Sequence, residues 1–364
     1  MMTLKTIQTS RRWALLAVAL VASLLLSACS GAGRIAASSW PGFTVDGETV
    51  YVAYGQAMRA LKLQNGNQIW QYPVEADRAL TFFAAPVVMD GRVVAGDYTQ
   101  NVYSLDQATG ALQWKFVDAE KRFIAPGLVV EDLYLMPSAD GTLYALTSEG
   151  KLAWSFTQSD EALWAQPVYD GEKVYLASMD HFVYALQVSE EAARLSWSAD
   201  LGGAMVSKPA LGEDGNLYVG TMTHEMIALS PNGKVLWRFD TNGAVWATPV
   251  VHEGLVMFGD LSGTIYALNA ANGRVEWTIS VDGPVIGSGA LLEDGVAFGI
   301  EKAGVQAISF QGVKQWSRAI DGEIQAGLVQ AGEFVLVGIT NGDRLIIALD
   351  PASGVERWSF TPSK

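Results

Sequence analysis

Cysteine and histidine are scarce in this chain of 364 residues, which contains one cysteine and three histidines. The single thiol of Cys29 has no second cysteine with which to form a disulfide, and no set of ligands for a zinc site is evident. Charged residues are also few, at 17% of the chain, whereas half of the residues are apolar. This composition excludes a disordered polymer and is ample for a large folded core.

Positive charge is in especially short supply. Lysine and arginine number 24 against 38 aspartates and glutamates, so the formal net charge is −14 at pH 7. Because a chain this acidic is repelled by a phosphate backbone, we expect no nucleic-acid partner. Long apolar runs are missing apart from one near the N-terminus, and its 14 residues fall short of the roughly 20 that a membrane-spanning helix needs. We therefore expect the mature protein to contact a membrane only through an anchor.

The N-terminal apolar run covers residues 13–26, and three basic residues precede it: Lys5, Arg11 and Arg12. This pattern is typical of a secretory signal peptide. Residues 26–29, with the sequence LSAC, resemble the lipobox of bacterial lipoproteins, in which the cysteine becomes the lipidated first residue. We predict a signal peptide over residues 1–28, lipidation of Cys29 and a tether over residues 29–38; cleavage that leaves a free thiol is the alternative. The protein is then exported and anchored to the outer membrane, or to the outer leaflet of the cell membrane where no outer membrane exists.

Tryptophan recurs at nearly even spacing along the rest of the chain. Eight tryptophans lie 39 to 44 residues apart: Trp70, Trp114, Trp154, Trp197, Trp237, Trp277, Trp316 and Trp358. A small residue followed by leucine or isoleucine, such as Ala228–Leu229, precedes each tryptophan by about ten residues. The intervening runs are short, rich in β-branched and aromatic residues, and separated by Asp-Gly and Thr-Gly turns. The chain therefore contains eight copies of one strand-rich unit.

Repeats of this length with four strands and no helix are typical of β-propeller blades. We predict an all-β fold over residues 39–364, an eight-bladed β-propeller of four-stranded antiparallel blades. A single sheet cannot bury both of its faces, so each blade must present the same packing surface to the next. The small residue lets neighbouring sheets approach, glycines form turns with positive φ, and the tryptophan fills the wedge between blades that splay outward.

Two of the units carry the pattern D-x-x-[TS]-G-x-x-x-W, at Asp106–Trp114 and Asp350–Trp358. This pattern resembles the tryptophan-docking repeat of the pyrroloquinoline-quinone (PQQ) type. Two groups carry PQQ-like repeats: quinoprotein dehydrogenases, and non-catalytic lipoproteins like BamB, an eight-bladed scaffold for outer-membrane barrel assembly. The repeat itself does not separate the two groups.

Chemistry favours the second group. In the quinoprotein alcohol dehydrogenases a disulfide of neighbouring cysteines stacks on the quinone, and carboxylates with an asparagine hold calcium. Here Cys29 is the only cysteine, and the 336 residues after the signal peptide leave no long insertion for an active site. The resemblance to BamB-like lipoproteins implies a non-catalytic, protein-binding scaffold with no cofactor and no metal. A PQQ-dependent dehydrogenase-like quinoprotein is the alternative.

Two of the three histidines fall in register, because His181 and His224 each lie four residues before the small residue of their repeat, whereas His252 does not. The flanking units have Gly141 and Gly263 at that position. Since histidine tolerates positive φ, we predict that both are turn residues. The alternative is a metal held between neighbouring blades, because packed sheets lie about 10 Å apart.

A second register places aromatic residues near the expected central channel. Four aromatics each stand three residues before the proline that opens an inner strand: Phe83, Phe123, Trp164 and Trp246. The other units are expected to have these residues there: Val206, Ile286, Ile324 and Ser39. Inner strands line the channel of a propeller, so the aromatics are predicted to gather at its mouth. They either plug the channel or form a docking surface for an envelope protein or an extended peptide segment, since tryptophan often forms binding hot spots.

Acidic residues are numerous in the loops predicted to lie on the same face: Glu75, Asp77, Asp118, Glu120, Asp160, Glu161, Asp200, Asp240, Asp282 and Asp321. Several precede a glycine and are suited to forming turns, and a charged surface also favours solubility. As a set they would give the rim a negative potential that attracts basic partners or cations.

Overall fold

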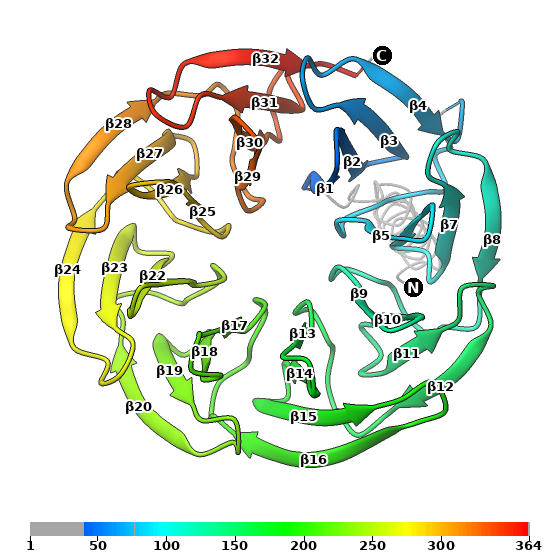
Figure 1. Ribbon diagram of the computed structural model, residues 1–364, viewed down its shortest axis with the longest axis horizontal. Coiled ribbons are helices and arrows are strands. Elements are labelled where there is room, and N and C mark those ends of the chain that lie inside the picture. Colours follow the sequence, from blue (N-terminus) through cyan, green and yellow to red (C-terminus); the bar gives the residue numbers. More distant parts are fainter. Residues whose placement is uncertain (1–39, 76, 363–364) are drawn as a thin grey trace, which may run out of the picture. The chain divides into compact units, whose positions relative to one another are not determined.

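The computed structural model describes residues 40–362 apart from residue 76. These residues form eight four-stranded antiparallel sheets, each built from four consecutive strands. The sheets are arranged as blades around a ring, with the first strand of each blade toward the centre and the fourth at the periphery (Figure 1). The eight-bladed β-propeller expected from the repeat is confirmed.

The strands of blades 1 to 4 are β1 Gly42–Asp46, β2 Thr49–Tyr54, β3 Ala57–Lys62 and β4 Gln68–Tyr72; β5 Val87–Met89, β6 Arg92–Gly96, β7 Val102–Asp106 and β8 Leu112–Phe116; β9 Leu128–Val130, β10 Leu133–Pro137, β11 Leu143–Leu146 and β12 Leu152–Phe156; β13 Val168–Tyr169, β14 Lys173–Ala177, β15 Phe182–Val188 and β16 Ala193–Asp200.

The strands of blades 5 to 8 are β17 Ala210–Leu211, β18 Leu217–Gly220, β19 Glu225–Leu229 and β20 Val235–Asp240; β21 Val250–His252, β22 Leu255–Gly259, β23 Thr264–Asn269 and β24 Val275–Ser280; β25 Ala290–Leu291, β26 Gly295–Ile300, β27 Gly304–Ser309 and β28 Lys314–Arg318; β29 Val329–Ala331, β30 Phe334–Gly338, β31 Ile346–Leu349 and β32 Glu356–Phe360.

Burial follows the position of a strand within its blade, as blade 6 illustrates. The middle strands β22 and β23 are buried along almost their whole length, because each face of the sheet packs against a neighbouring blade. The outer strand β24 instead alternates exposed and half-buried residues. The apolar runs of the sequence therefore correspond to middle strands, and the alternating stretches that contain the repeated tryptophans correspond to outer strands.

The small residue of each repeat pairs directly with the tryptophan of the outer strand, as Ala267 does with Trp277. A β-bulge follows at the next residue in all eight described blades. A bulge bends its strand and increases the local twist. The repeated pair of residues thus marks a bend in the third strand opposite the tryptophan.

Each tryptophan side chain reaches the following blade rather than solvent. The indole N–H of Trp277 donates to the carbonyl of Phe310 at 2.8 Å, and its ring covers Gly312, which has a φ of 79°. Seven indoles in the described residues make this hydrogen bond at 2.8 to 3.0 Å: Trp70, Trp114, Trp154, Trp197, Trp237, Trp277 and Trp316. The repeated tryptophans therefore stabilise the contact between neighbouring blades, which is the packing role predicted from their regular spacing.

The ring closes by packing two complete blades against each other. Side chains from β1–β3 and from β29–β32 share one core cluster, which includes Phe43, Val52, Leu336 and Ile346. Trp358 covers Gly66 of blade 1, as six of the other seven repeated tryptophans cover a glycine of the following blade, but its buried indole N–H has no acceptor in the described part of the chain. The closing interface is thus the one docking contact among the described blades that lacks its hydrogen bond.

The predicted signal peptide, the lipidated Cys29 and the tether over residues 29–38 lie outside the described residues. Within the part that is described, no helix has the length and apolarity needed to cross a membrane.

Candidate functional site

Backbone hydrogen bonds to the preceding blade hold the segments that lead into six of the inner strands. The backbone N–H of Leu163 donates to the carbonyl of Ser138 in the preceding blade at 3.1 Å, and the N–H of Val245 donates to that of Thr221 at 3.0 Å. Six residues make this contact, and their side chains are buried between blades: Phe82, Phe123, Leu163, Met205, Val245 and Val285. We call this the core position.

The residue after the core position turns its side chain away from the interblade core, because successive side chains in an extended chain point in opposite directions. Strand pairing aligns the inner strands, and counting four residues back from the aligned inner-strand position gives this residue in each described blade. We call the set the entrance ring: Trp40, Phe83, Ile124, Trp164, Val206, Trp246, Ile286 and Gln325. Apart from Gln325 the ring is apolar. Its members from blades 1 and 2, Trp40 and Phe83, contact each other with ring centroids 5.1 Å apart.

Two of the aromatic residues expected at the channel mouth are not available there. Phe123 is fully buried in the core between blades 2 and 3, and Ile124 takes its place in the entrance ring. The prediction was wrong because Pro126 stands one residue earlier relative to its strand than Pro86 does, as the pairing of Val130 with Leu133 shows. Phe83 is in the ring, but only 5% of it is exposed.

The same correction applies to two other positions. Ile324 is 1% exposed and lies in the core of blades 7 and 8, and Gln325 occupies the entrance ring. In blade 1 the ring residue is Trp40, whereas Ser39 lies outside the described residues. Val206 and Ile286 are in the ring as expected.

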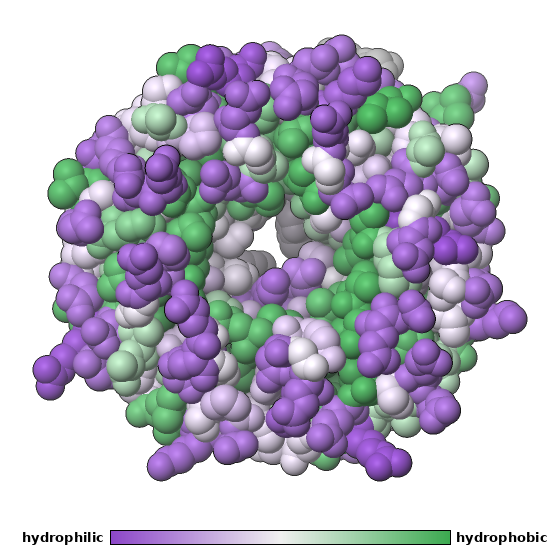
Figure 2. Space-filling model, viewed as in Figure 1, coloured by the Kyte–Doolittle hydropathy of each residue, from purple (hydrophilic) through white to green (hydrophobic). Residues whose placement is uncertain are grey.

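The two sides of the entrance ring differ in how tightly they are packed. Phe83 lies between Trp40 and Tyr98, at centroid distances of 5.1 and 5.0 Å, and the guanidinium of Arg122 lies 4.7 Å from the centre of the Tyr98 ring. Trp164 and Trp246 on the other side are only half-buried. The face in view in Figure 2 is open at its centre, with hydrophobic side chains along much of the opening and hydrophilic side chains around the outside.

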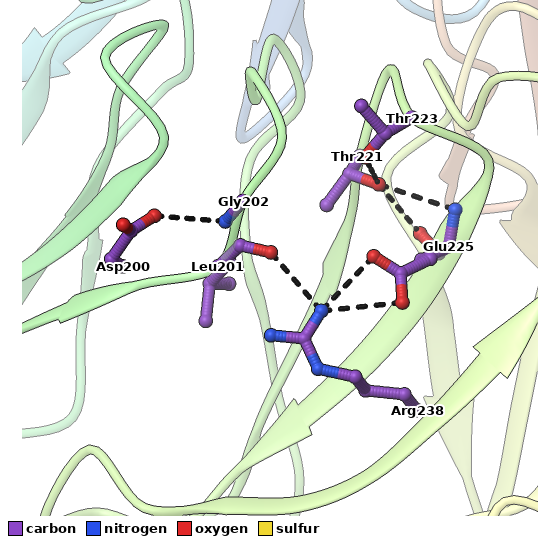
Figure 3. A network of polar contacts seen from close by, with 7 residues as sticks. All are labelled: Asp200, Leu201, Gly202, Thr221, Thr223, Glu225 and Arg238. Atoms are coloured by element: carbon purple, nitrogen blue, oxygen red, sulfur yellow. Dashed lines mark hydrogen bonds and ion pairs between the residues drawn. The ribbon is translucent and has the colours of Figure 1, made fainter.

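All ten of the loop acids singled out in the sequence are exposed. One of them also organises its own loop, because the Asp200 carboxylate accepts a hydrogen bond from the N–H of Gly202 at 2.9 Å (Figure 3). This loop is tied to the next blade by Arg238, whose Nη1 donates to the carbonyl of Leu201 at 3.0 Å and to the Glu225 carboxylate at 3.0 and 3.2 Å. The ion pair therefore positions the loop that leads into Val206.

Two buried aspartates, Asp260 and Asp97, were not predicted as site residues, and Asp260 holds the loop that follows Asp240. The Asp260 side chain is 0% exposed and accepts hydrogen bonds from the N–H of Gly243 and the hydroxyl of Tyr266, both at 2.8 Å. Burial raises the pKa of the Tyr266 hydroxyl, so it remains a proton donor to Asp260. Asp97 is equally buried and lies six residues before Tyr103, as Asp260 does before Tyr266. An aspartate six residues before a tyrosine is therefore the sequence signal by which both buried aspartates could have been found.

His181 and His224 adopt φ values of 79° and 67°, close to the 87° and 83° of Gly141 and Gly263. The prediction that they are turn residues is confirmed. Within the described residues, no group of three histidine, cysteine, aspartate or glutamate side chains is placed to hold a metal ion.

The chain is similar to proteins of one name along most of its length. The family model for "Outer membrane protein assembly factor BamB" matches residues 30–115, 98–202 and 187–308. The outer membrane protein assembly factor BamB of Xanthomonas campestris pv. campestris is 26% identical over 282 residues, which are 66% of this chain and 63% of that protein. BamB of Salmonella typhimurium is 29% identical over 171 residues, which are 44% and 42% of the two chains. The chain thus spans less than two thirds of the length of these relatives.

Solved structures share the fold. The crystal structure of BamB from Moraxella catarrhalis superposes with a TM-score of 0.71, covering 82% of this chain and 93% of that one at 16% identity. The computationally designed Ika8 protein superposes with a TM-score of 0.65, covering 76% and 85% at 16% identity. Since the second protein is a design, this likeness carries information on architecture and not on function. The family model matches well over half of the residues, and the chain therefore belongs to the family of the outer membrane protein assembly factor BamB.

Proposed function

We propose that this protein is a non-catalytic scaffold in the assembly of envelope or outer-membrane proteins, exported and anchored to the membrane by lipid on Cys29. The observation that carries the proposal is the partial exposure of Trp164 and Trp246 in the entrance ring; Trp40 is half-buried as well but packs against the buried Phe83. Large aromatic side chains that remain partly accessible in a mostly apolar ring are suited to binding a protein partner. Family membership supports the same role.

The charge around the entrance ring restricts the kind of partner. Eight of the ten exposed acids lie in loops that connect outer strands to the next inner strands, and Asp200 and Asp240 end the outer strands β16 and β20; the entrance ring begins at this end of the blades. A negative rim attracts basic segments and speeds their association, while it repels acidic ones. The preferred partner is therefore a basic or extended protein segment that buries apolar residues against the two tryptophans.

The anchor sets where this binding takes place. Lipid chains contribute about 0.8 kcal/mol for each buried methylene, so several chains on one cysteine hold a protein firmly at a membrane. The domain plan we propose is a signal peptide over residues 1–28, a lipidated tether over residues 29–38 and the propeller over residues 39–364. The scaffold then acts at the membrane surface without crossing it.

Crosslinking in native membranes tests the proposal. The double variant Trp164→Ala, Trp246→Ala is expected to weaken partner binding about thirtyfold or more, because two hot spots of at least about 1 kcal/mol each are lost. The matched control is Leu112→Ala, Leu152→Ala, which removes exposed apolar residues from the outer strands β8 and β12 and should leave capture unchanged. Equal capture by both double variants would contradict a docking role for the entrance ring.

The quinoprotein alternative has its own test. Purified protein mixed with pyrroloquinoline quinone and calcium is expected to show neither a retained quinone absorbance nor reduction of an electron-accepting dye. Either signal would replace the scaffold with a dehydrogenase.

A further inference from the structure

The entrance ring has a second layer, formed where the loop that enters a blade pairs with a turn of the same blade. In blade 2 the backbone N–H of Tyr98, in the turn between β6 and β7, donates to the carbonyl of Thr81 at 2.8 Å. Thr81 lies two residues before the ring residue Phe83, and the Tyr98 ring packs on Phe83 with centroids 5.0 Å apart. Blades 2 to 8 all make this backbone hydrogen bond. We call the two residues that it joins the loop position and the turn position.

Both positions present their side chains beside the ring residue. The segment is extended here, since Phe82 pairs as an antiparallel bridge with Asp97. Alternate residues of an extended segment point to the same side, so the loop position faces the same way as the ring residue two places later. The contact between Tyr98 and Phe83 shows that the turn position lies on that side as well.

Three adjacent blades are apolar at all of these positions. In blades 4, 5 and 6 the loop position is alanine, at Ala162, Ala204 and Ala244. The turn position holds Met179, Met222 and Leu261, whose N–H groups donate to these alanines at 2.9 to 3.1 Å. With the ring residues Trp164, Val206 and Trp246 they make nine side chains, which we call the apolar strip.

The other described blades interrupt this pattern. Each has a polar or charged residue at one or more of the three positions, including Gln56 in blade 1, Thr81 in blade 2, Arg122 in blade 3, Glu301 in blade 7 and Glu323 in blade 8. The apolar strip therefore occupies one sector of the ring.

Hydrogen bonds between blades make the strip continuous. The N–H of Met205 in blade 5 donates to the carbonyl of Ser178 in blade 4 at 3.1 Å. Met179 directly follows Ser178, and Val206 directly follows Met205, so the turn position of blade 4 lies beside the ring residue of blade 5. The same hydrogen bond joins blades 5 and 6.

The strip is accessible along its length. Val206 and Ala244 are each 8% exposed, and the other seven side chains are half-buried. A contiguous apolar surface of this kind on a folded protein marks an interaction site. Methionine is unbranched and polarisable, so Met179 and Met222 are suited to adapting their shape to a partner.

Negative charge borders the strip. Four exposed acids lie at or after the ends of the outer strands that lead into blades 4, 5 and 6: Asp160, Glu161, Asp200 and Asp240. None of them forms an ion pair with another described residue. The one base in the loops over residues 157–167, 201–209 and 241–249 is Lys208, which is half-buried. The surroundings of the strip thus favour a partner with positive charge next to its apolar residues.

The breadth of the strip selects a helix over a strand. Ring, loop and turn positions lie side by side, so the strip is several side chains wide as well as three blades long. An extended segment presents a single row of side chains on one face. An amphipathic helix instead presents a stripe built from positions i, i+3, i+4 and i+7, which is more than one side chain wide. Helices of this kind bind apolar surfaces by burying that stripe.

We propose that blades 4 to 6 bind a basic amphipathic helix of a partner protein, with its apolar face on the apolar strip and its flanking lysines or arginines next to the four acids. This inference rests on the proposed scaffold function and specifies both the form of the partner segment and the sector of the ring that holds it. It also separates Trp164 and Trp246, which belong to the strip, from Trp40, whose blade has Gln56 at the turn position.

Peptide binding tests the inference, using the chain from residue 29 onward with Cys29→Ser, which carries no lipid and needs no detergent. The probe is a fluorescently labelled peptide of about 18 residues, made of leucine, lysine and glutamine with leucine at helical spacing. A second peptide of the same composition alternates leucine with polar residues, as a strand does. Anisotropy at 0.15 M salt is expected to show at least tenfold tighter binding of the helical peptide. Equally tight binding of the alternating peptide would overturn the helix assignment.

A lysine placed in the strip provides the decisive variant. Met222→Lys puts a positive charge among apolar side chains and against a basic helix, so it should weaken binding of the helical peptide at least tenfold. Gln56→Lys adds the same charge at the turn position of blade 1 and should leave the affinity unchanged. Thermal unfolding checks that both are folded, and Met179→Lys is the second variant at the equivalent position of blade 4. Equal effects of Met222→Lys and Gln56→Lys would mean that only net charge matters and would remove the strip as the binding site.

The bordering acids have a smaller, salt-dependent role. Asp160→Asn, Glu161→Gln is expected to weaken the helical peptide a few-fold at 0.15 M salt and to leave its affinity nearly unchanged at 1 M salt, where surface charges are screened. Crosslinking in native membranes keeps the two proposals apart. Loss of partner capture by Trp164→Ala, Trp246→Ala with full capture by Met222→Lys would retain the scaffold and overturn the helix site. Full capture by both variants would overturn both.

Discussion

The outer tryptophans and the entrance-ring tryptophans place the same side chain in opposite situations. Trp277 and Trp246 are both half-buried, but Trp277 donates its N–H to the next blade and packs its ring on a glycine, whereas the N–H of Trp164 is unpaired among the described residues. The outer set recurs in every blade, whereas the entrance ring has a tryptophan in only three of the described blades, at Trp40, Trp164 and Trp246. In a repeat protein, a residue present in all units serves the contact between units, and a residue present in few of them is free to serve another purpose.

Removing an outer tryptophan should give the largest loss of stability. Trp277→Ala deletes the indole that joins blades 6 and 7, and we expect the free energy of unfolding to fall by about 3–5 kcal/mol. Urea denaturation followed by circular dichroism measures this change. A loss below 1 kcal/mol would mean that the docking contact is not what holds neighbouring blades together.

Substitution of Gly312, on which the Trp277 ring packs, should give the next largest loss of stability. A Cβ on Gly312 would lie 2.8 Å from the Trp277 ring, whereas a Cβ on Gly91, which has a similar φ of 73°, meets none of the described atoms within 4 Å. Both alanine variants carry the strain of positive φ, so the difference between them isolates the clash with the indole. Gly312→Ala is expected to cost about 1–3 kcal/mol more than Gly91→Ala in the same unfolding assay. Equal costs would show that the ring is free to move aside.

Trp358, at the interface between blades 8 and 1, allows the contribution of the indole hydrogen bond to be measured by comparison with Trp277. Phenylalanine keeps the apolar contact but loses the N–H, so Trp277→Phe should cost about 1 kcal/mol for the lost bond to Phe310. Trp358→Phe loses no hydrogen bond within the described residues and removes an unpaired buried donor, so its cost should be close to zero. Similar costs at the two positions would indicate that Trp358 has an acceptor after all.

The sequence predicted the architecture because packing between blades must repeat. Even spacing of tryptophans, small residues opposite them and turns at fixed intervals are consequences of one interface used eight times. The positive φ of His181 and His224 was predictable for the same reason, since the glycines of neighbouring units mark that turn. The buried Asp260 and Asp97 share a spacing to tyrosine that was also present in the sequence, but only their hydrogen bonds reveal its meaning.

The candidate site was less predictable, and Phe123 shows why. A proline precedes the inner strand in several blades, but proline is tolerated at more than one position where a strand begins, and Pro126 is displaced by one residue. A shift of one residue exchanges the core position with the entrance ring, so Phe123 moves from the channel mouth to the interior. The unpaired groups of Ser207 and Trp358 were beyond sequence reasoning altogether, because the lack of a partner is a property of three-dimensional packing.

The entrance-ring pair should show the smallest effect on stability. Trp164→Ala, Trp246→Ala is expected to lower the free energy of unfolding by less than Trp277→Ala alone, at roughly 1 kcal/mol for each site, because neither indole N–H makes the hydrogen bond to the next described blade that Trp277 makes. If the same double variant loses partner capture while remaining folded, stability and binding are carried by different tryptophans of one ring. If it instead unfolds as readily as Trp277→Ala, the two aromatics are needed to seal the channel, and the docking surface has to be sought elsewhere on the acidic rim.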